Sequence, residues 1–236
     1  MKNELRTAFT WLLAGALLPL AASADTSGRE YHFSVYLDGK RIGDHRYQIT
    51  GLPGSERVRS EASFEFKLLF VTLYRYQHVA NEAWRDGCLT DLDAVTNDNG
   101  RDYRVSSDQR QSYLLLTRLE PDRESREIAD CPASFAYWDL QRMKADALIN
   151  AQNGEVLRTR LVREGRERLA DREVVRYRLE AEGLSPIDLW YRAEDDAWVG
   201  LATRRDGRLL EYRLESAPPR QPSVADDARV EDAVGV

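Results

Sequence analysis

Alternation between apolar and polar residues is the feature that most constrains the fold of this chain. The alternating segments are residues 31–37, 43–49, 62–66, 172–183 and 187–214. A period of two sends successive side chains to opposite faces of a strand, whereas an amphipathic helix has a period of 3.6. The chain is therefore predicted to be a succession of short strands.

Turn sequences separate these strands. They include Asp38-Gly39, Asn153-Gly154, Asp195-Asp196 and Asp206-Gly207. Asn-Gly and Asp-Gly favour tight hairpins because both residues adopt positive φ readily. Ten or more strands joined in this way predict an all-β, mainly antiparallel fold, in which a strongly curved meander sheet forms a barrel or half-barrel. A two-sheet β-sandwich is the alternative.

Two details of this prediction concern particular segments. We expect at most one short helix, around residues 138–143, and this segment reads equally well as a loop. Residues 68–84 are rich in β-branched and aromatic residues and are expected to form one long strand or two.

The two ends of the chain differ in composition from the middle. Residues 1–24 have two basic residues near the start, an apolar run and a final Ala-Ser-Ala, which is the layout of a secretory signal peptide. The alternative is an uncleaved membrane anchor, but the apolar run is short for a spanning helix. Residues 216–236 are Pro-containing and then acidic, and we expect a disordered tail. Residues 25–215 would then form a single β-rich domain, exported to the periplasm and soluble after cleavage of the signal peptide, with no transmembrane anchor.

The net charge of the chain and its distribution argue against two classes of binding partner. The formal net charge of the chain is −6, and basic residues are mixed with acidic ones throughout. A nucleic-acid-binding surface needs clustered positive charge, as does binding to an anionic membrane. We therefore expect neither nucleic acid nor an anionic membrane surface as a partner.

The only two cysteines of the chain are Cys88 and Cys131. An even pair in an exported protein normally forms a disulfide. A catalytic thiolate would need a neighbouring histidine as base, and no motif places one near either cysteine. Two cysteines without CxxC spacing also do not form a zinc site. We predict a disulfide between them.

Two of the three histidines, His32 and His45, lie in the first predicted hairpin. A two-residue loop at Asp38-Gly39 with regular pairing would set His32 opposite His45 and seed a metal site. A register longer by one residue, with Gly39 in a bulge, instead gathers the apolar residues of both strands on one face. We favour the second register, with His32 outside and His45 inside among aromatic residues, and predict no metal site.

Recognisable catalytic motifs are missing from the sequence. No nucleophile elbow, zinc-protease motif, P-loop or dinucleotide fingerprint is present. Carboxylates are abundant, and Glu82 shares a strand face with Trp84, but no pair has a recognisable acid–base arrangement. We therefore predict no catalytic residue and no cofactor, and consider a non-enzymatic role better supported than an enzymatic one.

Aromatic residues are concentrated in a few predicted strands. In residues 67–76 both alternating faces are apolar, which indicates a strand covered on both sides or one face lining an apolar cavity. Ordinary core packing explains most of these rings, but some are candidates to line a cavity for a lipid or other hydrophobic small molecule. The candidate lining residues are Phe64, Phe66, Phe70, Tyr74, Tyr76, Trp84, Phe135, Tyr137 and Trp190.

Several stretches together resemble an uncharacterised family of exported bacterial domains of unknown function. They are YLDGKRIGDHRY, EAWRDGCL, CPASFAYW, LINAQNGEV and WVGLATRRDGRLLEYRL, and they span residues 31–214. The last stretch is also similar to the closing strands of the wider group of periplasmic half-barrels that includes the lipoprotein carriers. That resemblance implies a curved antiparallel sheet enclosing an apolar cavity for acyl chains. The chain lacks an arginine placed as in the lipoprotein carriers, and the resemblance carries over no catalytic residue.

The sequence supports one leading hypothesis for the function and leaves two alternatives. The leading hypothesis is a periplasmic protein that binds a lipid or other hydrophobic ligand in an apolar cavity. The first alternative is a cell-envelope enzyme that uses scattered carboxylates with His45 or His78. The second is a structural or interaction module that pairs through an exposed sheet edge. The sequence identifies neither the ligand nor a protein partner.

Overall fold

The computed structural model describes residues 28–68 and 70–216, and in this part of the chain almost all regular structure is β-strand. The predicted signal peptide, residues 1–24, lies outside the described residues, and so does the predicted tail apart from Ser216. The strands are β1 (Arg29–Leu37), β2 (Lys40–Leu52), β3 (Ser55–Leu68), β4 (Val71–Arg85), β5 (Cys88–Asp98), β6 (Arg101–Gln109), β7 (Tyr113–Glu120), β8 (Glu124–Ala129), β9 (Ala147–Ile149), β10 (Val156–Leu169), β11 (Arg172–Ala181), β12 (Ile187–Arg192), β13 (Trp198–Arg205) and β14 (Arg208–Ser216).

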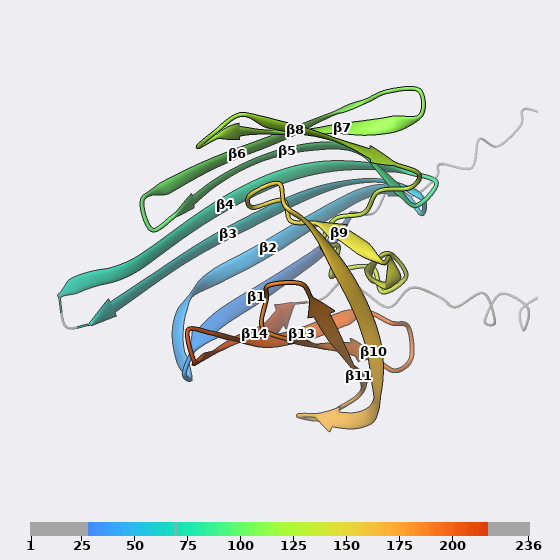
Figure 1. Ribbon diagram of the computed structural model, residues 1–236. Helices are drawn as coiled ribbons and strands as arrows, with labels where there is room; N and C mark the ends of the chain where they lie inside the picture. Colours follow the sequence, from blue (N-terminus) through green and yellow to red (C-terminus); the bar gives the residue numbers. More distant parts are fainter. Residues whose placement is uncertain (1–27, 69, 217–236) are drawn as a thin grey trace, which may run out of the picture.

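All fourteen strands belong to one antiparallel sheet, with the order β8-β7-β6-β5-β4-β3-β2-β1-β14-β13-β12-β11-β10-β9. Consecutive strands are neighbours, and the first and last strands meet in the middle. The sheet is not closed, since β8 and β9 are its two edges. Figure 1 shows it curling into a trough. The predicted half-barrel meander is confirmed, and the alternative of a two-sheet sandwich is wrong.

The curl brings distant strands together at one end of the trough. The Arg205 guanidinium, at the end of β13, lies 2.9 Å from the Asp98 carboxylate, at the end of β5. Five strands separate β5 from β13 in the sheet. Bulges in several strand pairs, among them β1–β2, β3–β4 and β12–β13, increase the local twist that makes this curvature possible.

The predicted turns are present. Asp38 and Gly39 have φ values of 49° and 77°, as a tight hairpin of this class requires, and Asp206-Gly207 is similar. Asn153-Gly154 also marks a hairpin, but the loop between β9 and β10 is longer and covers residues 150–155.

The segment predicted as one long strand or two, residues 68–84, is almost entirely strand, with a hairpin bend near its start. β3 ends at Leu68 and β4 begins at Val71. Phe70 is fully exposed and Val71 is 60% exposed. The alternative in which residues 67–76 are covered on both faces is therefore wrong, because the middle of that segment is a hairpin tip, whereas Tyr74 and Tyr76 of β4 line the cavity described below.

The first hairpin has the favoured face pattern, with the bulge at a different place. Leu37 pairs with Lys40 across a two-residue loop, and the register shifts farther along, so that Val35 pairs with Gly43 and Phe33 with His45. The extra residue is Ile42, not Gly39 as predicted. Gly43 allows a close approach of β3, since a Cβ there would lie 1.9 Å from the Ser63 carbonyl oxygen.

The histidines of this hairpin do not face each other. His32 pairs with Arg46 and its Nε2 lies 2.9 Å from the Asp44 carboxylate, whereas His45 is on the opposite, buried face. Among residues 28–68 and 70–216 no group of three or more potential metal-ligating side chains comes together. No helix in this part of the chain is long and apolar enough to cross a membrane.

The connection from β8 to β9, residues 130–146, crosses the concave face and is called the plug here (Figure 1). Its regular structure is limited to a single 3-10 turn, η1 (Arg142–Lys144), where a short helix or loop was predicted. Apolar side chains of the plug are buried against the sheet, and these are Ala133, Ala136, Trp138, Leu140 and Met143.

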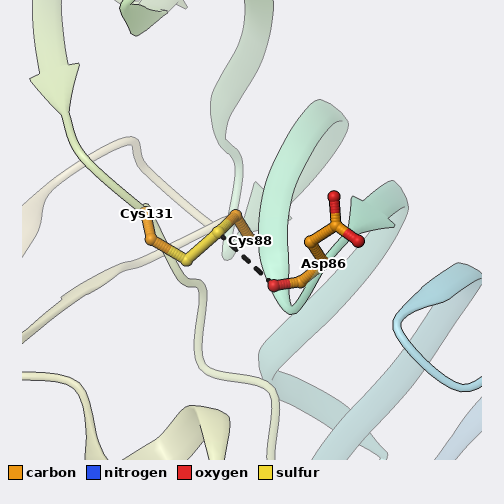
Figure 2. The surroundings of a disulfide bond; sticks show 3 residues. All are labelled: Asp86, Cys88 and Cys131. Atoms are coloured by element: carbon orange, nitrogen blue, oxygen red, sulfur yellow. Dashed lines mark hydrogen bonds between the residues drawn. A yellow bond between two sulfur atoms is a disulfide. The ribbon is translucent and has the colours of Figure 1, made fainter.

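A disulfide fixes the start of the plug. Cys88 at the beginning of β5 is bonded to Cys131 across 43 sequence positions, as Figure 2 shows. Beside it, the Leu89 amide donates a hydrogen bond to the Pro132 carbonyl at 2.8 Å. The plug is thus attached both covalently and by backbone pairing to the beginning of β5.

A buried ion pair fixes the end of the plug. The Arg142 guanidinium lies 2.6 Å from the Glu56 carboxylate of β3, and both side chains are almost inaccessible to solvent. The guanidinium also lies over two indole rings that meet nearly at right angles, 4.3 Å from the centre of Trp84 and 4.4 Å from that of Trp138. A cation over an aromatic ring is attracted by it, and here two rings contribute.

Removal of the disulfide should destabilise the fold without changing its topology. In the chain-entropy model, a cross-link over 43 positions stabilises the folded state by roughly 3–4 kcal/mol. We expect the Cys88→Ala/Cys131→Ala double variant to lose about that much unfolding free energy in urea titrations. Addition of a reductant should shift the wild-type midpoint and leave that of the double variant unchanged. Equal midpoints for the oxidised wild type and the double variant would contradict this.

Candidate functional site

A cavity of about 690 Å³ lies between the concave face of the sheet and the plug. Its walls come from β2, β3 and β4, from the plug, from the β9–β10 and β11–β12 turns, and from the adjoining ends of β13 and β14. The cavity reaches solvent beside exposed lining residues such as Leu184 and Arg204. We call this side the mouth.

Cross-strand rows of side chains explain why the sheet is hollow here. Near the mouth, Phe64 of β3 pairs with Tyr76 of β4 and their rings stack with centroids 5.2 Å apart. Farther in, Ser60 pairs with Ala80. Small residues follow large ones along both strands, so the rings stand as walls and the small residues leave space between them.

His45 lies on the β2 wall. Its Nε2 is 2.7 Å from the Ser60 hydroxyl and its Nδ1 is 3.4 Å from the Tyr212 hydroxyl. The ring stacks on Tyr47 with centroids 4.3 Å apart. Burial holds the pKa of His45 well below its usual value, with nearby His78 adding to the effect. This is the buried, hydrogen-bonded histidine among aromatic residues that the sequence predicted.

His78 lies on the β4 wall, in the same cross-strand row as His45, with Ala62 of β3 between them. Its Nδ1 is 2.8 Å from the hydroxyl of Thr96 on β5. Burial lowers the pKa of His78 to about 4. The imidazole is therefore neutral at neutral pH.

Glu82 lies on the same wall, two alternate positions beyond His78. Its Oε2 accepts a hydrogen bond of 3.0 Å from the Trp84 indole nitrogen. Burial raises the pKa of Glu82, and nearby polar groups, Arg142 among them, act in the opposite direction. The pKa values of His45, His78 and Glu82 are thus all shifted in the direction that favours the uncharged forms.

Polar and charged side chains meet at the mouth. Asp98 accepts hydrogen bonds from the Tyr74 hydroxyl at 2.7 Å, from the Gln152 amide at 3.3 Å and from Arg205 at 2.9 Å. Arg208 lies over the Phe66 ring at 4.3 Å and pairs with an aspartate of the β1–β2 turn. Arg205 and Arg208 are thus each paired with a carboxylate.

Six of the nine predicted lining residues border the cavity: Phe64, Phe66, Tyr74, Tyr76, Phe135 and Tyr137. The structure places the other three elsewhere. Phe70 projects from the tip of the β3–β4 hairpin, because the strand bends there. Trp84 is in the core, 5.9 Å from Trp138, where it covers Arg142. Trp190 is paired with Glu167 through its indole nitrogen.

Other lining residues were missed by the sequence analysis. Tyr47 and Tyr212 follow the same alternation as the residues that were chosen, so the pattern could have identified them. Ile42 does not follow it, because it is the extra residue of the bulge. The turn segments 150–153 and 183–185 also line the cavity. No sequence signal marks them, because the curl of the sheet brings these turns to the mouth.

Acid should destabilise the fold in part through His78. Its folded pKa, about 4, lies below the unfolded value of about 6.5, so the unfolded state takes up the proton first. The contribution of the neutral ring is complete above pH 6.5 and is lost as the pH falls towards 4. Between pH 7 and pH 5 the wild type should lose about 2 kcal/mol more unfolding free energy than His78→Gln. Urea titrations at both pH values measure the difference, with His32→Gln on the outer face as the control. An equal loss in wild type and His78→Gln would contradict the assignment.

Comparison with solved structures shows what the fold is similar to. The beta-barrel-like protein of domain of unknown function DUF1849 from Brucella abortus matches with a TM-score of 0.62 and 9% sequence identity. The match covers 82% of this chain and 98% of that one. At this identity the likeness concerns the fold alone. LprF from Mycobacterium bovis gives a TM-score of 0.29 at 12% identity, over 84% of this chain and 89% of its own.

Sequence comparisons agree with an assignment to a domain of unknown function. No curated protein sequence matches the chain. Residues 33–215 match the family described as domain of unknown function DUF6134, and this range runs from β1 into β14. The chain therefore belongs to the DUF6134 family.

Proposed function

We propose that this protein binds a lipid or another hydrophobic small molecule in the cavity beneath the plug. The observation that carries the proposal is a cavity of about 690 Å³ whose lining includes nine aromatic side chains. Binding sites for small molecules typically have volumes of about 300–1,000 Å³, apolar walls and a few well-placed polar groups. The volume of the cavity lies in this range, and its lining combines aromatic and aliphatic side chains with polar ones.

The size of the hollow also favours a ligand over imperfect packing. Protein interiors contain few voids larger than a water molecule, because the atoms around a void lose their dispersion contacts. The sheet side of the cavity is bordered by two apolar clusters. Ile42 and Phe64 belong to the smaller cluster, and Tyr47, Val58 and Ala80 belong to the main core. Both clusters border the cavity without filling it.

Export to the periplasm is part of the proposal. Its support is the signal-peptide pattern of residues 1–24 together with the Cys88–Cys131 disulfide. Disulfides persist in oxidising compartments and are rare in the bacterial cytosol. A periplasmic location would also give the protein access to hydrophobic molecules of the cell envelope.

A second candidate function is acid–base catalysis in the same cavity. The observation in its favour is that His78 and Glu82 both line the cavity with displaced pKa values. Four residues along one strand, however, correspond to roughly 13 Å. That spacing is too long for the two side chains to act on one another directly, so binding is the better-supported proposal.

Blocking the cavity tests the proposal. Ala80 is buried and lines the cavity, so a phenyl ring at this position would occupy the hollow. We expect Ala80→Phe to weaken binding of the fluorescent apolar probe N-phenyl-1-naphthylamine at least tenfold, which is about 1.4 kcal/mol. Fluorescence titration gives the affinity, and circular dichroism checks the fold.

The matched control is Gln77→Phe, which adds the same ring to the exposed face of the same strand. It should bind the probe like the wild type. Native mass spectrometry of protein purified from the periplasm should also reveal a co-purifying hydrophobic molecule that Ala80→Phe lacks. Absence of probe binding by the wild type at micromolar concentration, together with no co-purifying molecule, would refute the proposal.

A further inference from the structure

The polar atoms inside the cavity point to the chemical class of the ligand, an inference that rests on the proposed function. We propose that the cavity selects amphiphiles with an uncharged hydrogen-bonding end-group, such as a hydroxyl, amide or carbonyl. That group would lie against the ring of His78, and the apolar remainder would extend along the aromatic walls to the mouth.

One nitrogen on the cavity wall is left for a ligand. Both nitrogens of His45 have partners, Ser60 and Tyr212. His78 uses only Nδ1, which is bonded to Thr96, and within the described ranges its Nε2 has no hydrogen-bond partner. The His78 residue is only 8% exposed and lines the cavity, yet its Nε2 is not fully buried. A ligand group in the cavity can therefore form a hydrogen bond with this nitrogen.

The hydrogen bond between His78 and Thr96 does not determine whether Nε2 acts as a donor or as an acceptor. The Thr96 hydroxyl can either donate a hydrogen bond to Nδ1 or accept one from it. In the first case Nε2 carries the proton and donates to the ligand, and in the second it accepts. A hydroxyl or an amide can bond to Nε2 in either case, and a carbonyl can accept a hydrogen bond from Nε2 in the first case.

The surroundings disfavour a charged end-group. Burial keeps the His78 ring neutral, as its depressed pKa shows. The buried cation of the plug, Arg142, is already paired with Glu56 and lies over two indole rings. A carboxylate beside His78 would therefore be desolvated without a counter-charge, which is costly. For an ammonium group beside His78, the lining carboxylate on the same strand is Glu82, roughly 13 Å away.

The cationic side chains that line the cavity lie at its mouth. Arg205 is paired with Asp98, Arg208 with Asp38, and the Arg204 guanidinium donates to the Gly207 carbonyl. Between these residues and His78 the β3 and β4 walls are aromatic. This stretch, with Phe66, Phe64, Tyr74 and Tyr76, suits the apolar part of the ligand.

A panel of dodecyl compounds that differ only in their end-group tests this inference. N-phenyl-1-naphthylamine is displaced at pH 7.5 by 1-dodecanol, dodecanoate or dodecylamine, each below its aggregation concentration. We expect 1-dodecanol to bind at least tenfold more tightly than either charged compound. Equal or tighter binding of dodecanoate or dodecylamine would overturn the inference.

Two variants assign the preference to His78. His78→Phe keeps a ring and removes the nitrogen, and it should weaken 1-dodecanol binding about threefold to tenfold, the usual effect of one lost hydrogen bond. His78→Gln keeps an amide group near the position of Nε2 and should retain the preference for the alcohol. His32→Phe on the outer face should bind like the wild type.

The outcomes separate this inference from the proposed function. If the wild type binds all three compounds with similar affinity, or if His78→Phe binds 1-dodecanol as tightly as the wild type, the selectivity is refuted and the cavity remains a binding site. If the wild type binds neither the probe nor any dodecyl compound, the proposed function itself fails. Should His78→Phe not fold, the wild-type ratios and His78→Gln still decide the question.

Discussion

The contact between Arg142 and Glu56 is the interaction on which the cavity depends. The plug, residues 130–146, has almost no regular secondary structure of its own, so its position is fixed by its contacts with the sheet. The disulfide holds one end, backbone hydrogen bonds to Ile149 of β9 hold the middle, and Arg142 with Glu56 holds the other end. Removing only one partner of such a buried ion pair leaves an uncompensated charge, which is strongly unfavourable. These attachments keep the plug over the trough as the roof of the cavity.

Curvature and side-chain size together shape the space beneath that roof. The bulged meander curls until Arg205 reaches Asp98 across the open side, so the mouth is bordered by an ion pair between the ends of two distant strands. On the inner face, small residues such as Ser60 and Ala80 alternate with large rings along neighbouring strands. The cavity therefore follows from the register of the sheet. A slip of one residue would turn the rings outward and replace the hollow with charged side chains.

Much of the fold could be predicted from local patterns, because strand alternation and turn chemistry are local properties. The face of His45 was predicted correctly, since only one register gathers the apolar residues of the first hairpin. Phe70 was misplaced because apolar residues stand on both alternating faces of residues 67–76, and alternation does not show where such a segment bends. The lack of a hydrogen-bond partner at His78 Nε2 and the pairing of Arg142 with Glu56 depend on contacts between distant elements, for which the sequence has no signal.

The most direct test of the central claim, a ligand cavity between the curved sheet and the plug, is a crystal structure of the protein with 11-bromo-1-undecanol. Bromine scatters anomalously, so its position can be located independently of the rest of the ligand. The account predicts one anomalous peak within the cavity near Phe66 and Tyr74, with the hydroxyl of the ligand beside His78. A cavity filled by protein side chains, or a bromine peak only on the outer surface, would contradict it.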